Sequence, residues 1–109
     1  ITCTLERYRG QAQRPLDFFL DRSASPALTA RSRQVGDRLP LPGRPGRSLK
    51  KWYVDEKIPR TLRDQLPVLE SGGRVAGAAG LGPDAAFLPS EDGEAWHIRL
   101  IHPKFGEKN

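Results

Sequence analysis

Gly43-Arg44-Pro45-Gly46-Arg47-Ser48-Leu49-Lys50-Lys51-Trp52-Tyr53 is the stretch that sets the fold of this chain. Its first half is a glycine-punctuated basic loop, and its second half begins an amphipathic helix. Ser48 is a favourable N-cap residue for that helix, which the pattern extends to about Lys57. Lys50 and Lys51 fall on its polar side. The apolar positions at i, i+3 and i+4 predict one buried helix face, formed by Leu49, Trp52 and Tyr53.

A second short helix is expected directly after the first. Pro59 ends the first helix and is suited to begin the next one. In that next turn Leu62 and Leu66 are spaced i, i+4 and face inward, whereas Arg60 and Arg63 lie on the other side. The centre of the chain is therefore predicted to be a pair of short helices.

Short apolar or alternating runs lie before and after this pair and predict strands at residues 1–8, 16–20, 27–35, 68–69, 74–76, 85–88 and 96–101. Ser71-Gly72-Gly73 is a hairpin signal. The small residues from Gly77 to Leu81 predict that two backbones approach closely. The arrangement indicates an α+β fold, in which short mixed or antiparallel strands pack with the central helices, and a single domain over residues 1–109.

Two of these strands carry further expectations. In the strand at 27–35, alternation would give an apolar back and a cationic front that carries Arg31 and Arg33. In the first strand, Cys3 falls on the apolar side and is expected to be core packing. A lone cysteine fits a reducing, cytoplasmic compartment. No apolar run approaches the ~20 residues that a membrane-spanning helix needs, so no membrane partner is expected.

The basic residues are concentrated in the middle of the chain. Between Arg31 and Arg63 there are ten Lys or Arg and three Asp or Glu, while the whole chain has a formal net charge of +5. Most of the ten are arginine, whose planar guanidinium suits phosphate. Such a concentration indicates a polyanion-binding surface. The candidate RNA-binding residues are Arg31, Arg33, Arg38, Arg44, Arg47, Lys50, Lys51, Arg60 and Arg63.

The loop at 43–46 has two readings that the residues leave open. Its small residues allow close approach to a phosphate beside the helix N-terminus, or it is a plain connection between two elements. Other chemistry lacks support. His97 and His102 have no matching cysteine or second carboxylate for zinc, and the adjacent Asp55 and Glu56 point in different directions. The chain is therefore expected to have no catalytic and no metal-binding residues of its own.

An ordered set of motifs carries a resemblance to a known family over about residues 28–88, with residues 1–27 as additional N-terminal strands. The chain resembles the C-terminal domain of tRNA(Ile)-lysidine synthase. The motifs are Gly36-Asp37-Arg38-Leu39-Pro40-Leu41-Pro42-Gly43, Leu49-Lys50-Lys51-Trp52, Ile58-Pro59, Leu62-Arg63-Asp64-Gln65-Leu66-Pro67-Val68-Leu69, Val75-Ala76-Gly77 and Gly80-Leu81.

This resemblance implies a function. Enzymes of the family are ligases that use ATP and lysine to convert the wobble cytidine of a CAU-anticodon tRNA(Ile) into lysidine. The chemistry belongs to an N-terminal catalytic domain that this chain lacks, so no cofactor is expected here. The resemblance implies tRNA binding toward the acceptor stem, and a layered fold similar to a domain of a tRNA synthetase. Within the matching motifs the basic residues are Arg38, Lys50, Lys51 and Arg63.

Two other functions remain open from the residues alone. The first is a non-specific nucleic-acid-binding module, which would bind duplex DNA as well as tRNA. The second is an interaction domain that positions the catalytic domain, with its basic face against an acidic partner. That second function predicts no binding of RNA.

Overall fold

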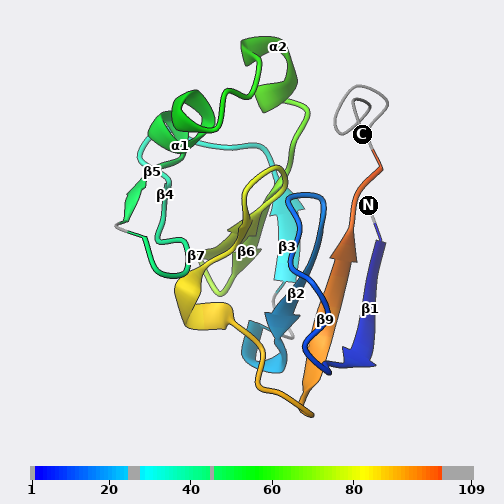
Figure 1. Cartoon of the computed structure of the whole chain (residues 1–109). Coiled ribbons are helices and arrows are strands. Elements are labelled where there is room, and N and C mark those ends of the chain that lie inside the picture. The colour runs from blue at the N-terminus through cyan, green and yellow to red at the C-terminus, as the bar shows by residue number, and fades with distance from the viewer. Residues whose placement is uncertain (1, 25–27, 45, 102–109) are drawn as a thin grey trace.

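The computed structural model describes residues 2–24, 28–44 and 46–101 (Figure 1). The fold is α+β, and the described residues form three antiparallel sheets and two short α-helices. One sheet has the order β1-β9-β2, a second has the order β3-β6-β7-β8, and a two-stranded ribbon pairs β4 with β5. Among the described residues, no helix has the length and apolar character that crossing a bilayer requires.

The first sheet joins the two ends of the described chain. β1 (Thr2–Arg7) and β2 (Asp17–Asp21) both pair with β9 (Glu94–Arg99), which lies between them. The sheet packs Phe18, Leu20 and Ile98 into a core cluster with at most 2% of each side chain exposed. β1 contributes little to that core, because all six of its residues are exposed.

The second sheet is the central layer. It consists of β3 (Leu28–Arg31), β6 (Val68–Ser71), β7 (Arg74–Ala78) and β8 (Gly82–Pro83). The hairpin from β6 to β7 turns at Gly72 and Gly73, which have φ of 56° and 82° and therefore the left-handed conformation that a two-residue hairpin loop requires.

A bulge distributes the side chains of β7 between the two faces of this sheet. Leu69 pairs with Gly77 and Glu70 with Val75, so Ala76 is an additional residue. As a result Val75 joins the core beneath the helices, whereas Ala76 joins the core shared with the first sheet. A Cβ atom on Gly77 would lie 3.2 Å from Phe18 and 3.1 Å from the carbonyl oxygen of Gly82. The close approach predicted from the small residues is confirmed.

The helices form the third layer, on the side of the central sheet away from β1 and β9 (Figure 1). The ribbon of β4 (Arg38–Leu39) and β5 (Arg47–Ser48) leads into α1 (Leu49–Asp55), and α2 (Arg60–Arg63) follows. Both predicted helices are confirmed. Two short 3-10 helices, η1 (Arg22–Ala24) and η2 (Ala85–Phe87), are also present.

Three predictions of local structure are wrong. Residues 85–88 begin a 3-10 turn rather than a strand, because the Asp84 carboxylate accepts a hydrogen bond from the backbone N–H of Ala86. The strand expected at 27–35 covers only Leu28–Arg31, and Ala30 on its supposed apolar back is exposed. Cys3 is exposed instead of packed in the core, because no element covers β1 on that side within the described residues.

Candidate nucleic-acid interface

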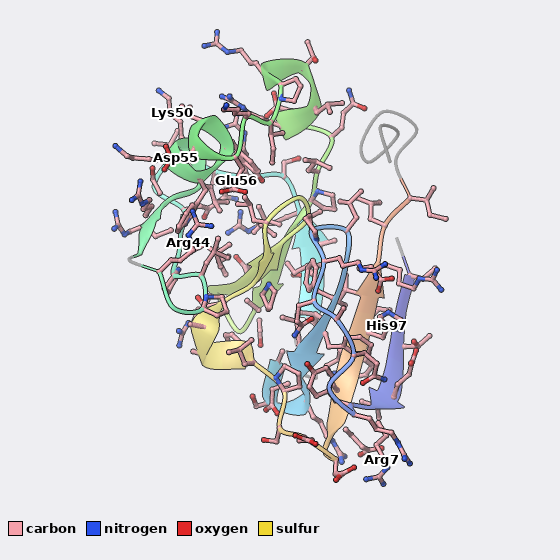
Figure 2. The ribbon with its side chains drawn as sticks, viewed as in Figure 1. Arg7, Arg44, Lys50, Asp55, Glu56 and His97 are labelled. Carbon is pink, nitrogen blue, oxygen red and sulfur yellow. The ribbon has the colours of Figure 1, made fainter. Side chains whose placement is uncertain are left out.

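Helix α1 presents its lysines because the other face is buried. The Ser48 hydroxyl accepts a hydrogen bond from the backbone N–H of Lys51 and so caps the helix. The predicted buried stripe is confirmed: the side chains of Leu49, Trp52 and Tyr53 are at most 2% exposed. Burial of this stripe turns Lys50 and Lys51 outward, and both are exposed. Figure 2 shows Lys50 on the outer side of the helix.

Trp52 is enclosed by two arginines that come from outside α1. Its indole Nε1 donates a 2.6 Å hydrogen bond to the backbone carbonyl of Leu39. The guanidinium carbon of Arg44 lies 4.5 Å from the ring centroid, and that of Arg47 lies 5.2 Å away. These distances are within the range of cation–π attraction. Trp52 therefore positions two guanidinium groups at the surface while it remains buried.

The same two arginines contact carboxylates at the end of α1. Arg44 lies 3.3 Å from Glu56, and Arg47 lies 2.5 Å from Asp55. Asp55 and Glu56 thus point toward different partners, as expected for adjacent helix residues. All four side chains keep between 32% and 48% of their surface exposed, so water and salt reach both pairs.

Arg31 and Arg33 make contacts within the fold instead. Arg31 bridges Asp37, at 2.9 and 3.0 Å, and Glu70, at 2.8 Å, and its side chain is only 19% exposed. The hydrogen bonds that Arg31 donates to the Asp37 carboxylate are the main reason that the pKa of Arg31 is raised and that the pKa of Asp37 is lowered. The predicted cationic face of the strand is therefore absent at Arg31, because this residue of β3 pairs with Glu70 of β6 and with Asp37 after β3.

Arg33 also has a partner within the domain. Its Nε lies 3.1 Å from Asp64, and its guanidinium carbon lies 5.7 Å from the centre of the Tyr53 ring. Tyr53 is fully buried, and burial raises the pKa of its hydroxyl. Arg33 thus packs over the helical core rather than projecting from a strand.

The remaining predicted residues are less constrained. Arg38 donates to the carbonyl of Gly46 and Arg63 to the carbonyl of Ile58, at 3.1 and 2.9 Å. Within the described part of the chain, the side chains of Lys50, Lys51 and Arg60 have no hydrogen-bond or ion-pair partner. Among the predicted RNA-binding residues, those without a close carboxylate therefore lie on α1, α2 and the ribbon before them, and not on β3.

A second group of ionisable residues lies on the first sheet. The imidazole of His97 contacts Asp17, at 2.5 Å, and Glu6, at 2.9 Å, and stacks on Phe19. Burial of the ring opposes its protonation, but the hydrogen bonds to both carboxylates outweigh burial and raise the pKa of His97. No local spacing in the sequence predicts this group, because Glu6, Asp17 and His97 come from three different strands.

The His97 group does not make a metal site. Over residues 2–24, 28–44 and 46–101, no set of three or more His, Cys, Asp or Glu side chains is arranged to hold a metal ion. His102 lies outside the described residues. The ion pairs of His97 instead join β1 and β2 across β9.

Comparison with known proteins identifies the family of the chain. Residues 28–100 match the family described as the TilS substrate C-terminal domain, which extends the resemblance beyond residue 88. A tRNA(Ile)-lysidine synthase of Ralstonia nicotianae is 42% identical over 81 residues, which is 73% of this chain and 17% of that protein. A tRNA(Ile)-lysidine synthase of Geobacillus kaustophilus is 39% identical over 80 residues, 72% of this chain and 17% of that protein.

A solved structure described as a TilS C-terminal domain shares the fold. It superimposes with a TM-score of 0.70 at 24% identity, covering 92% of this chain and 83% of the other. The two curated relatives are much longer than the region that they share with this chain, which spans 17% of each.

Proposed function

The chain belongs to the TilS substrate C-terminal domain family, and from this premise we propose that it binds tRNA for a tRNA(Ile)-lysidine synthase. The observation that carries the proposal is the set of cations without carboxylate partners on the two helices, namely Lys50, Lys51 and Arg60. Arg44 and Arg47 lie beside them in exposed pairs. Phosphate groups are the ligand that such a surface suits best.

The mode of binding follows from RNA geometry. An A-form stem has a deep, narrow major groove, so proteins recognise it mainly through phosphates, 2′-hydroxyl groups and shape. The helical pair offers long, solvated side chains over a rigid buried core, which suits contacts with a backbone more than reading of base edges. Arg38 and Arg63, which lie in the family motifs and use only backbone carbonyls, border this surface. In the proposal, the tRNA(Ile) acceptor stem lies across α1 and α2.

The parent enzyme supplies the chemistry in this proposal. Its N-terminal domain would use ATP and lysine to form lysidine at the wobble cytidine of CAU-anticodon tRNA(Ile), in the cytoplasm. The domain described here would hold the tRNA and would need no cofactor. Arg31 and Arg33 would contribute indirectly, because their ion pairs fix the segment that leads to the ribbon and α1.

The test is a titration of labelled tRNA(Ile) with the domain at several salt concentrations. If about four to six phosphates are engaged, log K should fall with log salt with a slope of roughly −3 to −5. The variant Lys50→Glu/Lys51→Glu should weaken binding and reduce the slope. The matched control is Arg9→Glu/Arg14→Glu, which changes the charge equally in the loop between β1 and β2 and should have a smaller effect.

Three outcomes would contradict the proposal. An affinity that does not change with salt concentration would contradict the phosphate contacts on which the proposal depends. Equal competition by duplex DNA would favour a non-specific nucleic-acid module instead. Absence of any RNA binding, together with a stable complex with the catalytic domain, would favour an interaction domain.

A further inference from the structure

Asp55 and Glu56 occupy positions that the helix itself does not favour. Asp55 is the last residue of α1 and Glu56 is its C-cap, with its backbone N–H bonded to the carbonyl of Trp52. The C-terminal end of a helix carries partial negative charge and prefers cations. Two carboxylates at this end are therefore mildly unfavourable for α1. Any favourable effect that they have must come from the side chains that they contact.

What they contact is the pair of arginines on Trp52. Glu56 reaches both terminal nitrogens of Arg44 through a single oxygen, at 3.3 and 3.4 Å, which is longer than a strong charge-assisted hydrogen bond. Asp55 reaches Arg47 at 2.5 Å. In Figure 2, Asp55 and Glu56 lie between Lys50 and Arg44. The carboxylates therefore sit inside the cationic surface rather than beside it.

Each arginine also has a contact that does not depend on a carboxylate. Both guanidinium groups lie over the ring of the buried indole of Trp52, which donates a hydrogen bond to the carbonyl of Leu39. Exposed ion pairs contribute little net stability and exchange readily for other partners. A phosphate can therefore replace each carboxylate while the guanidinium group stays on the indole.

We propose that Asp55 and Glu56 act as internal competitors of the RNA phosphates for Arg44 and Arg47. This inference rests on the proposed tRNA binding and names how that surface is regulated. In the free domain each arginine is occupied by a carboxylate, and RNA engages it only by displacing that carboxylate. The two acids thereby set the affinity of the interface below the value that its arginines would otherwise give.

The experiment compares tRNA(Ile) binding by the wild-type domain and by Asp55→Asn/Glu56→Gln, titrated at several salt concentrations. The variant should bind roughly twofold to twentyfold more tightly, because two exposed competing contacts are lost. Its salt slope should also be steeper, because no displaced carboxylate remains to take up salt cations, so the net release of counterions from the RNA is larger. Asp55→Asn and Glu56→Gln alone should each give part of the gain. Urea unfolding of each variant serves as the check that it folds.

The matched control is Asp92→Asn/Glu94→Gln. It removes the same charge near the start of β9, where Glu94 pairs with Arg22 on the surface. Arg7, which contacts the backbone of Asp92, lies at the opposite end of the molecule from α1 in Figure 2. The control should therefore change the affinity by less than the variant at α1.

Each alternative result overturns the inference. Weaker binding of Asp55→Asn/Glu56→Gln would show that the carboxylates position the arginines for RNA. Unchanged affinity of this variant would show that Arg44 and Arg47 do not contact the tRNA. An equal gain in the control would show an effect of net charge alone. If the wild-type domain binds no tRNA at all, the proposed function fails first, and that result is distinct from these three.

Discussion

Trp52 supports both the core and the surface of this domain, and its replacement gives the most informative test of the structure. The residue is fully buried and belongs to the core cluster beneath the helices. Truncation of a buried tryptophan to alanine costs about 3–5 kcal/mol. The lost hydrogen bond leaves the carbonyl of the buried residue Leu39 without its partner, which adds roughly 1 kcal/mol or more.

The expected loss is large compared with the stability of the domain. A chain of 109 residues has a free energy of unfolding of roughly 5–15 kcal/mol. Trp52→Ala should therefore bring the domain close to its unfolding threshold. Trp52→Phe keeps an aromatic ring but loses the N–H donor, and should cost only about 1–2 kcal/mol. The order wild type, Trp52→Phe, Trp52→Ala is the prediction.

The assay is urea unfolding followed by fluorescence and circular dichroism. Trp96, the second of the two tryptophans, remains as a fluorescent probe on the first sheet when Trp52 is replaced. A Trp52→Ala domain that unfolds within about 1 kcal/mol of wild type would refute the reasoning, because it would mean that the indole is not packed as described. A Trp52→Phe variant as unstable as Trp52→Ala would assign the effect to the hydrogen bond and not to packing.

Two further predictions concern pH. The pKa of His97 is raised in the folded state, so its ion pairs stabilise the fold fully below its ordinary pKa of about 6.5. This stabilisation is lost as the pH rises through the folded-state pKa. The urea midpoints of wild type and His97→Gln should therefore differ more at pH 6 than at pH 9. The pKa of Asp37 is lowered in the folded state, so its ion pair stabilises the fold above its ordinary pKa, and this stabilisation is lost as the pH falls through the folded-state pKa. Asp37→Asn should be about 1–3 kcal/mol less stable than wild type at pH 7. In an acid titration followed by circular dichroism, the stabilities of the two proteins should become equal at low pH.

The sequence predicted the elements whose signals are local. The cap at Ser48, the stripe of Leu49, Trp52 and Tyr53, and the hairpin at Gly72 all appear where the pattern placed them. Each depends on residues within a few positions of one another, so the chemistry of the segment alone determines it. Among the wrong predictions, the turn at residues 85–87 depends on the Asp84 side chain, which competes with strand formation by accepting a hydrogen bond from the backbone N–H of Ala86.

The exposure of each cation was harder to predict. Arg31 follows the alternation of an exposed strand face, but Glu70 and Asp37 reach it from β6 and from the turn after β3. Glu70 is 39 positions away in sequence, and no local period reports such a contact. The same holds for the group of Glu6, Asp17 and His97. Sequence patterns therefore located the basic region but not the ion pairs within it.

This difference decides where a polyanion should bind. A phosphate responds to charge that is not already matched at close range, because a neighbouring carboxylate screens its guanidinium partner. Arg31 is matched on two sides within the fold, so its formal charge adds little to the outer field. Lys50 and Lys51 are matched by no described carboxylate and extend from a helix whose inner face is fully buried. In the proposed function, the RNA-binding surface would therefore be centred on α1, and the ion pairs of Arg31 and Arg33 would hold the ribbon and helix in place.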